Sequence, residues 1–346
     1  MNERNYWLGF SAIPGMGPAK FRKLLEEFKT AKAAWEAKKP EFSIEKYLIQ
    51  LKEKDVWYLT LLDKDYPELL RQIKNPPFVL YGKGQMPDGT WFSRSISVVG
   101  ARKTTQYGRE VTKLLVTELA LRGLTIVSGL ALGIDAVSHM TALENNGRTI
   151  AVLGCGADCC SPAENLSIYK DILKTNNCIV SEFPLGMKPT QWTFPARNRI
   201  IAGLSQGVLV TEGAEDSGSL ITAEFALKFG RKVFAVPGPI TSQMSKGPYK
   251  LIQKGAKLVT SGEDILKELK IQKSKIKITG QNSKARKGDT KEENTILKLL
   301  ENEPLHFDEI VGKTKFKPSE LSRIVSLMEL KGFIKSLNNG YFSITS

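Results

Sequence analysis

The chain has 346 residues, of which 41% are hydrophobic and 25% charged, which is typical of a globular protein with two or three domains. Its formal net charge of +14 favours a polyanionic partner. Every apolar run is shorter than the roughly 20 residues of a membrane span. Residues 1–4 also lack the basic-then-apolar order of a secretory signal, so we expect a cytoplasmic protein without a membrane partner.

Residues 1–55 predict a small helical domain of the SAM-like or helix-hairpin-helix kind. Apolar side chains recur at helical spacing over residues 19–28, on one face: Phe21, Leu24, Leu25 and Phe28. A Pro-Gly-Met-Gly-Pro turn at residues 14–18 precedes this helix. Such a turn can offer free N–H groups to a DNA phosphate, or it can only pack two helices together. Both interpretations stay open.

Residues 56–269 alternate short apolar strands with helical patterns, which predicts an α/β fold with a Rossmann-like, doubly wound and mainly parallel sheet. An entry stretch, residues 66–70 followed by 75–82, is expected to add an edge strand. The core strands are expected near residues 95–99, 124–127, 149–153, 178–181, 207–211, 232–236 and 257–260.

Several of these strands end in small and polar residues. Carboxyl ends of parallel strands open on one edge of the sheet, where ligands bind. Glycines and serines there let backbone N–H groups and helix N-termini approach a phosphate closely. Residues 217–219 form an anion nest before a helix expected over 220–229. The candidate phosphate-binding residues of this class are Gly100, Ser128, Gly129, Ser217, Gly218 and Ser219.

The familiar nucleotide fingerprints are missing from the sequence. There is no Walker A loop, and the first core strand ends without a G-x-G-x-x-G pattern. We therefore expect no bound NAD or ATP. The cysteines match no usual zinc spacing and are expected to be reduced, small apolar residues, so no metal or other cofactor is predicted: Cys155, Cys159, Cys160 and Cys178.

Cationic and aromatic residues mark the same edge. Arg102 and Lys103 follow the first core strand, and residues 188–199, ahead of a helix expected over 200–205, interleave both types: Lys188, Trp192, Phe194, Arg197 and Arg199. Arginines can hold phosphates while exposed rings stack on bases, which suits a single strand of nucleic acid. Alternatively the two rings belong to a packed loop, and Arg102 forms a structural ion pair.

Acidic residues are less informative. Asp135 and His139 share one helix face and could form an acid–base pair, or they could cap and orient the helix start. Other acids border the edge: Asp158, Glu182, Glu212 and Asp216. Without a second nearby histidine or a metal constellation, we do not expect an enzyme.

Residues 270–291 are predicted to be a basic, mobile linker, since residues 267–291 hold nine Lys or Arg against two Asp or Glu. Residues 292–346 predict a winged helix, with a hairpin turning at residues 338–340 and helices at 292–300, 307–311 and 319–330. The third helix carries few cations, so duplex binding and protein contact both stay open.

Taken together, these patterns resemble the DNA-processing protein A family (DprA, also called Smf). The resemblance rests on Val-Val-Gly-Ala-Arg at 98–102 and Ser-Gly-Leu-Ala-Leu-Gly-Ile-Asp-Ala at 128–136, with His139. It continues through Phe-Pro-Ala-Arg-Asn-Arg-Ile-Ile-Ala-Gly-Leu-Ser at 194–205, Ser-Gly-Ser-Leu-Ile-Thr-Ala at 217–223 and Phe-Ala-Val-Pro-Gly at 234–238.

The resemblance implies a homodimer that binds single-stranded DNA, protects incoming strands and loads the RecA recombinase onto them in natural transformation. It makes Arg102 the main phosphate contact and gives supporting roles to Arg197, Asn198 and Arg199. Ser128, Gly129, Ser217 and Gly218 would line the pocket. The chain departs from the family pattern at Ala101, Ser161 and Tyr249.

Two other functions remain possible at this point. A nucleotide phosphoribohydrolase on a related fold would use the loop at residues 216–222, although that loop lacks the Pro-Gly-Gly-x-Gly-Thr pattern of such enzymes. A duplex-specific regulator would act through the winged helix and would lose DNA binding when residues 290–346 are deleted.

Overall fold

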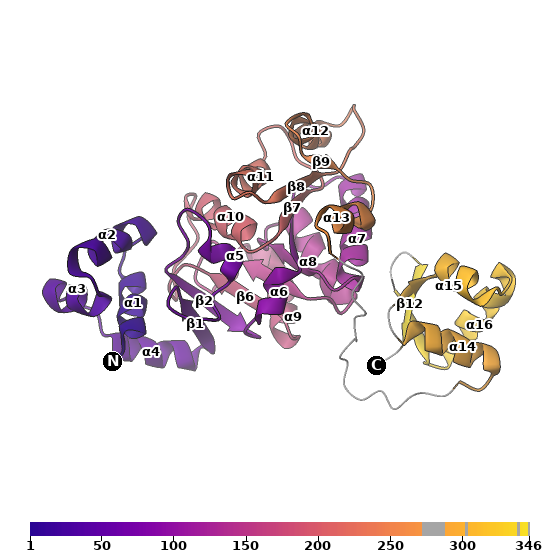
Figure 1. The fold of residues 1–346 in the computed structure, drawn as a ribbon, viewed down its shortest axis with the longest axis horizontal. Coiled ribbons are helices and arrows are strands. Elements are labelled where there is room, and N and C mark those ends of the chain that lie inside the picture. Colours follow the sequence, from indigo (N-terminus) through magenta and orange to yellow (C-terminus); the bar gives the residue numbers. More distant parts are fainter. Residues whose placement is uncertain (272–287, 302–303, 338–339, 345–346) are drawn as a thin grey trace.

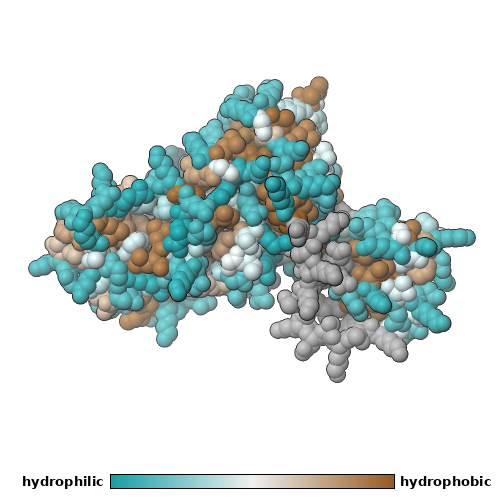
Figure 2. Space-filling model, in the orientation of Figure 1, coloured by the Kyte–Doolittle hydropathy of each residue, from teal (hydrophilic) through white to brown (hydrophobic). Residues whose placement is uncertain are grey.

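The computed structural model describes residues 1–271, 288–301, 304–337 and 340–344. In chain order it consists of a helical unit, an α/β unit and a small C-terminal unit (Figure 1). None of the helices in these described ranges is long and apolar enough to cross a membrane. In the view of Figure 2, hydrophobic residues reach the surface in separate patches between hydrophilic ones.

The helical unit contains α1 (Glu3–Ala12), α2 (Pro18–Phe28), α3 (Ala31–Lys38) and α4 (Ile44–Glu53). Helix α2 begins one residue before the predicted start because proline suits the first helical position. Its predicted apolar face is confirmed: Phe21 is 2% exposed and stacks on Phe78 at 4.1 Å between ring centroids. Since Phe78, Val79 and Tyr81 belong to the same core cluster, the helical unit shares its core with the first strands of the sheet.

The central sheet has nine strands in the order β1-β2-β6-β5-β4-β3-β7-β8-β9. The seven strands from β6 through β5, β4, β3, β7 and β8 to β9 pair in parallel. Strand β2 pairs antiparallel with both of its neighbours, β1 and β6. The strands are β1 (Val56–Thr60), β2 (Val79–Gly84), β3 (Ser95–Val99), β4 (Thr125–Ser128), β5 (Thr149–Val152), β6 (Cys178–Ser181), β7 (Gly207–Val210), β8 (Lys232–Ala235) and β9 (Lys257–Leu258).

The seven predicted core strands are confirmed to within two residues at each end. The prediction that residues 66–70 and 75–82 add an edge strand is wrong in the strand's position. Strand β2 forms there, but β1 pairs with its outer side and takes the edge itself. Burial explains this arrangement: Leu80 and Tyr81 are both almost fully buried, as expected of an inner strand.

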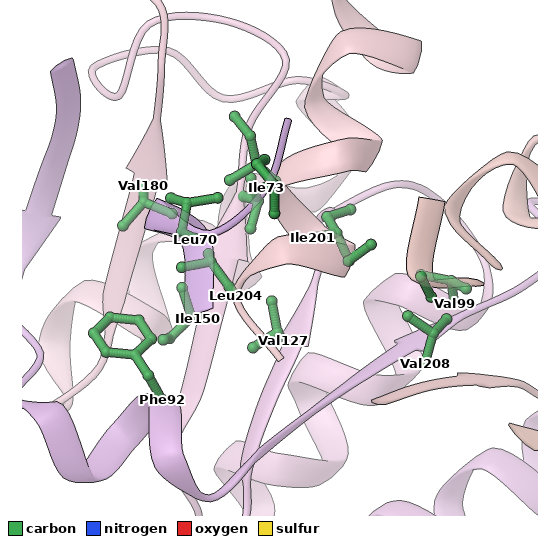
Figure 3. Packing of buried hydrophobic residues seen from close by; sticks show 14 of the residues in the cluster. Leu70, Ile73, Phe92, Val99, Val127, Ile150, Val180, Ile201, Leu204 and Val208 are labelled. Atoms are coloured by element: carbon green, nitrogen blue, oxygen red, sulfur yellow. The ribbon is translucent and has the colours of Figure 1, made fainter. Parts of the chain in front are cut away.

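Helices cover both faces of the sheet, which confirms the doubly wound fold. On one face Ile201 of α10 and Leu204, which follows that helix, pack on Val127, Ile150 and Val208 (Figure 3). On the other face α7 packs on the alternate strand residues. These helices are α5 (Glu68–Arg71), α6 (Gly89–Ser93), α7 (Gln106–Leu121), α8 (Ile134–Glu144), α9 (Leu166–Lys174), α10 (Thr193–Gly203), α11 (Gly218–Lys228), α12 (Lys246–Gln253) and α13 (Gly262–Glu268).

The chain starts the parallel sheet at β3 and adds β4, β5 and β6 on one side, then returns to add β7, β8 and β9 on the other. The strand order therefore reverses between β3 and β7. In open α/β sheets the ligand crevice lies at such a switch point, outside the carboxyl ends of the strands. The loops after β3 and β7 accordingly border the expected ligand site.

The C-terminal unit confirms the predicted winged helix. Its elements are α14 (Lys291–Leu300), β10 (Leu305–His306), α15 (Phe307–Thr314), α16 (Pro318–Leu330), β11 (Ile334–Leu337) and β12 (Tyr341–Ile344). On the third helix, α16, Leu327 and Leu330 are 45% and 85% exposed, whereas its only cation is Arg323. The predicted turn at 338–339 and most of the predicted linker lie outside the described residues.

Candidate nucleic-acid interface

At the switch point, Glu212 holds the loop after β3 in place. Its carboxylate is 3% exposed and accepts hydrogen bonds from the Thr105 amide at 2.9 Å and the Thr105 hydroxyl at 2.7 Å. Its backbone carbonyl accepts a bond from the Ala101 amide. Thr105 in turn caps α7. The turn that carries Arg102 is therefore fixed at both ends.

Arg102 is exposed on this turn and has no hydrogen bond or ion pair within the described residues. Its guanidinium carbon lies 5.3 Å from the ring centroid of Phe194. Lys103, its neighbour, is also exposed. The ion-pair alternative for Arg102 thus finds no acidic partner in the part of the chain that the structure describes.

The two aromatic candidates lie side by side along the edge. Phe194 covers the end of β5, since a Cβ on Gly154 would lie 3.1 Å from its ring. Trp192 is 59% exposed and meets Phe183, which follows β6, edge-on at 5.7 Å. Trp192 is therefore not the packed ring of a buried loop, and more than half of its surface is open to solvent.

Residues 193–199 are helical, which corrects the prediction that this helix begins at residue 200. Pro195 does not prevent it, because the N–H groups of the first helical turn need no intrahelical partner. The helix turns the side chains of residues 194–199 in different directions, so they do not form one continuous row.

Arg197 points inward from α10 and is 4% exposed. It donates hydrogen bonds to the carbonyls of Gly129 and of Val152, the latter at 2.8 Å. A Cβ on Gly129 would lie 2.0 Å from this guanidinium, so a larger residue there would displace the Arg197 side chain. Burial lowers the pKa of Arg197, and Asp135 opposes this effect while the nearby charge of Arg102 adds to it. Arg197 thus fixes the ends of β4 and β5 from inside the protein, and its charge lies close enough to Arg102 to feel it.

Asn198 and Arg199 connect α10 to its neighbours. The Asn198 amide donates to the Gly218 carbonyl at 3.3 Å, at the start of α11. Arg199 forms an ion pair with Glu182, and both side chains are largely buried. Arg199 therefore lies on another face of α10 than Phe194.

The nest at the start of α11 has one open position. Helix α11 begins at Gly218, two residues earlier than predicted, and Ser217 caps it by accepting from the Ser219 amide. Ser219 is 8% exposed, whereas Gly218 is exposed and has open space around its α-carbon. An anion could approach this helix end at Gly218.

The remaining candidates shape the crevice or lie beside it. Ser128 is fully buried and donates to the Val98 carbonyl at 2.7 Å. Gly100 leaves no room for a side chain, since a Cβ would lie 2.6 Å from Ile134. Lys188 is exposed at the end of a loop whose Leu185 amide donates to the Tyr47 hydroxyl of α4.

Asp135 and His139 do not form an acid–base pair. Asp135 accepts hydrogen bonds from the amides of Gly129 and Ala131, whereas the His139 Nδ1 bonds to the Thr149 hydroxyl at 2.7 Å. The structure therefore supports the alternative in which both residues orient the local backbone.

His139 predicts an acid-dependent loss of stability. Burial, helped by the charge of Arg197, lowers its pKa from 6.5 to about 3. Between these two pH values the unfolded chain binds a proton at His139 that the folded protein does not. The contribution of neutral His139 to the free energy of unfolding is therefore complete above about pH 6.5 and falls as the pH drops. The expected loss is up to about 1.4 kcal/mol per pH unit. Urea unfolding at pH 7 and 4.5 should show a smaller pH difference for His139→Gln, and equal differences would contradict it.

The cysteines lie among apolar residues near the strand ends. Burial raises the pKa of Cys155 to about 12, so its thiol stays protonated. No group of three or more His, Cys, Asp or Glu side chains is arranged to hold a metal within the described ranges. At the family-pattern departure near residue 249, the Gly247 amide donates to the Gly213 carbonyl at 2.9 Å, so that amide has a packing role.

Comparison with known proteins agrees with the fold. Residues 57–270 match the family model of DNA recombination-mediator protein A, and residues 281–340 match the DprA winged helix domain. The chain belongs to the DNA recombination-mediator protein A family. It is 46% identical to the DNA processing protein DprA of Bacillus subtilis over 224 residues, which is 64% of this chain and 74% of that protein.

Two solved structures of this family are similar. DprA from Streptococcus pneumoniae has a TM-score of 0.65 at 35% identity, covering 78% of this chain and 99% of that chain. DNA processing protein A from Helicobacter pylori, described for its single-stranded DNA binding mode, has a TM-score of 0.54 at 30% identity, covering 62% and 97%.

For this member of the DNA recombination-mediator protein A family, sequence reasoning missed the role of two acids. Glu212 fixes the Arg102 turn, and Asp158 accepts from the Gly186 amide and pairs with Lys54 at 2.6 Å, which ties the loop before Lys188 to the end of α4. Both follow strand ends, but nothing in a single sequence indicates which loop each would bind.

Proposed function

We propose that this protein binds single-stranded DNA along the carboxyl edge of its sheet and acts there as a recombination mediator. The observation that carries the proposal is Arg102, an exposed cation without an acidic partner in the described chain, held on a rigid turn at the switch point. A cation whose charge is not neutralised by the protein is available to a phosphate.

The side chains around Arg102 favour an unpaired strand over a duplex. Phe194 lies under the guanidinium and Trp192 exposes more than half of its surface nearby along the edge. Rings of this kind stack on bases that are free of pairing, at about 1–3 kcal/mol per base. The single-stranded DNA binding described for the Helicobacter pylori relative supports the same interpretation.

The candidate residues divide into three roles in this proposal. Arg102, Lys103 and Lys188 contact phosphates, as does the Gly218 end of the nest at residues 217–219. Trp192 and Phe194 stack on bases. The others do not contact the strand beside Arg102 but position the residues there: Gly100, Ser128, Gly129, Arg197, Asn198 and Arg199.

The wider role rests on membership of the family. We assign to this chain protection of incoming strands, loading of RecA during natural transformation, and homodimer formation in the cytoplasm. None of these steps requires catalysis by the chain itself. The buried acids at the edge already have partners. Asp135 and Glu212 accept hydrogen bonds from backbone amides, and Glu182 forms an ion pair with Arg199. This leaves the phosphoribohydrolase alternative without a free general base among the buried acids of the described edge.

The test is a gel shift with a single strand and its duplex at two salt concentrations. Oligo-dT should bind more tightly than the duplex, and its affinity should fall steeply with salt as counterions are released. Preferential binding to the duplex, or an affinity independent of salt, would reject the proposal.

A further inference from the structure

A pocket lies between the helical unit and the α/β unit, away from the Arg102 turn. Its volume is about 300 Å³. One wall is the α1–α2 turn with the start of α2, and the other is formed by Asn75 and Arg199. No acidic side chain is among the residues that line it: Gly15, Gly17, Pro18, Ala19, Lys20, Asn75 and Arg199.

The strand order places this pocket at the carboxyl edge. Strand β2 is antiparallel to β6, with Tyr81 opposite Ser181, so the start of β2 lies beside the end of β6. Asn75 comes shortly before that start. The edge therefore presents Arg102 after β3, Phe194 over β5 and Trp192 against Phe183 after β6, and then this pocket at β2.

The first turn of α2 offers unsatisfied donors. Its N-cap is Gly17, which supplies no side-chain oxygen, and Pro18 has no N–H to satisfy. The amides of Ala19 and Lys20 lack intrahelical partners because they belong to the first turn. Together with the positive end of the helix dipole, they favour an anion.

Two cations complete the site. The Lys20 ammonium folds back over the turn and would lie 3.7 Å from a Cβ on Gly15. Arg199 uses one guanidinium nitrogen for Glu182, while its Nη1 is buried and has no hydrogen-bond partner in the described structure. A buried donor without a partner costs free energy, so a ligand oxygen that pairs with it is stabilised.

We propose that this pocket binds a backbone phosphate of the same single strand, at the next strand of the sheet edge after the one where Trp192 lies. The inference rests on the proposed function and extends its binding site onto the helical unit. The α1–α2 turn is then a DNA contact and not only a link between two helices, and a strand must be long enough to reach it from Arg102.

Gly17 allows a sharp test. It has a φ of −96° and nothing within 4 Å of a Cβ, so Gly17→Asp and Gly17→Asn both fit. Both also cap α2 better than glycine. The two variants differ only in charge, and the aspartate would repel a phosphate in the pocket. Gly17→Asn is thus a matched control for folding and for helix capping.

Affinity should be measured by fluorescence anisotropy on oligo-dT of about 6 and about 20 nucleotides, lengths that bracket typical single-strand site sizes. Gly17→Asp should bind the long strand about three- to tenfold more weakly than Gly17→Asn, and the short strand equally well. Lys20→Gln should lower the salt slope on the long strand by about 1, as for one lost phosphate contact. Lys32→Gln is its control, since the Lys32 amide bonds to Glu3 at the opposite end of α1.

Equal affinity of the two Gly17 variants for the long strand would overturn the pocket as a phosphate site. Equal weakening on both lengths would also overturn it, because the new carboxylate would then repel the DNA from a distance and not from within the pocket. Neither result touches the proposed function, which fails separately if the wild-type protein does not bind single strands.

Discussion

Replacing Arg102 by glutamate should weaken binding to oligo-dT at least about tenfold. The wild-type guanidinium is exposed, has no acidic partner in the described chain and lies over Phe194. The variant would replace a phosphate contact by a phosphate repulsion and would remove the cation from the ring. Glu212 fixes the surrounding turn through backbone and Thr105 contacts that do not involve the Arg102 side chain, so the fold should be unchanged.

Two further variants separate charge from geometry. Arg102→Lys keeps the charge but loses the planar group, so its affinity should fall between those of wild type and Arg102→Glu. Lys228→Glu changes the charge equally at the far end of α11, about 15 Å along the helix axis from Gly218, and should bind almost normally. If Arg102→Glu bound oligo-dT like wild type, the proposed site would be misplaced.

Replacing Arg197 by methionine should lower the free energy of unfolding by about 3–5 kcal/mol. The side chain is 4% exposed, donates to the carbonyls of Gly129 and Val152, and lies near the buried Asp135. Methionine fills similar space but leaves the carbonyls without that donor and Asp135 without its counter-charge. Urea unfolding monitored by circular dichroism would measure the loss.

A second substitution tests whether the buried charges are coupled. In Arg197→Met with Asp135→Asn, no unpaired charge remains, so the double variant should lose less stability than the two single variants summed. Additive losses would show that Asp135 and Arg197 act independently. A single Arg197→Met variant within about 1 kcal/mol of wild type would contradict a structural role altogether.

Strand prediction succeeded where local patterns carry the information. Strands β3 to β8 combine short, largely apolar runs with small or polar residues at or just after their ends, and both features are visible in the chain itself. The start of α10 was misjudged because Pro195 resembles a helix breaker unless it is known to lie in the first turn. Likewise β2 could not be recognised as an inner strand, since its outer neighbour β1 is defined only by pairing.

For the site, the sequence by itself indicated the edge and the residue types along it, and it singled out Arg102 as a candidate phosphate contact. Only the tertiary structure decided which arginines are free. Residues 197 and 199 both follow the aromatic cluster, yet Arg197 is buried behind Gly129 and Arg199 is paired with Glu182. The reason is that helix rotation and strand order, set by packing between distant segments, determine whether a cation meets solvent, a carbonyl or an acid.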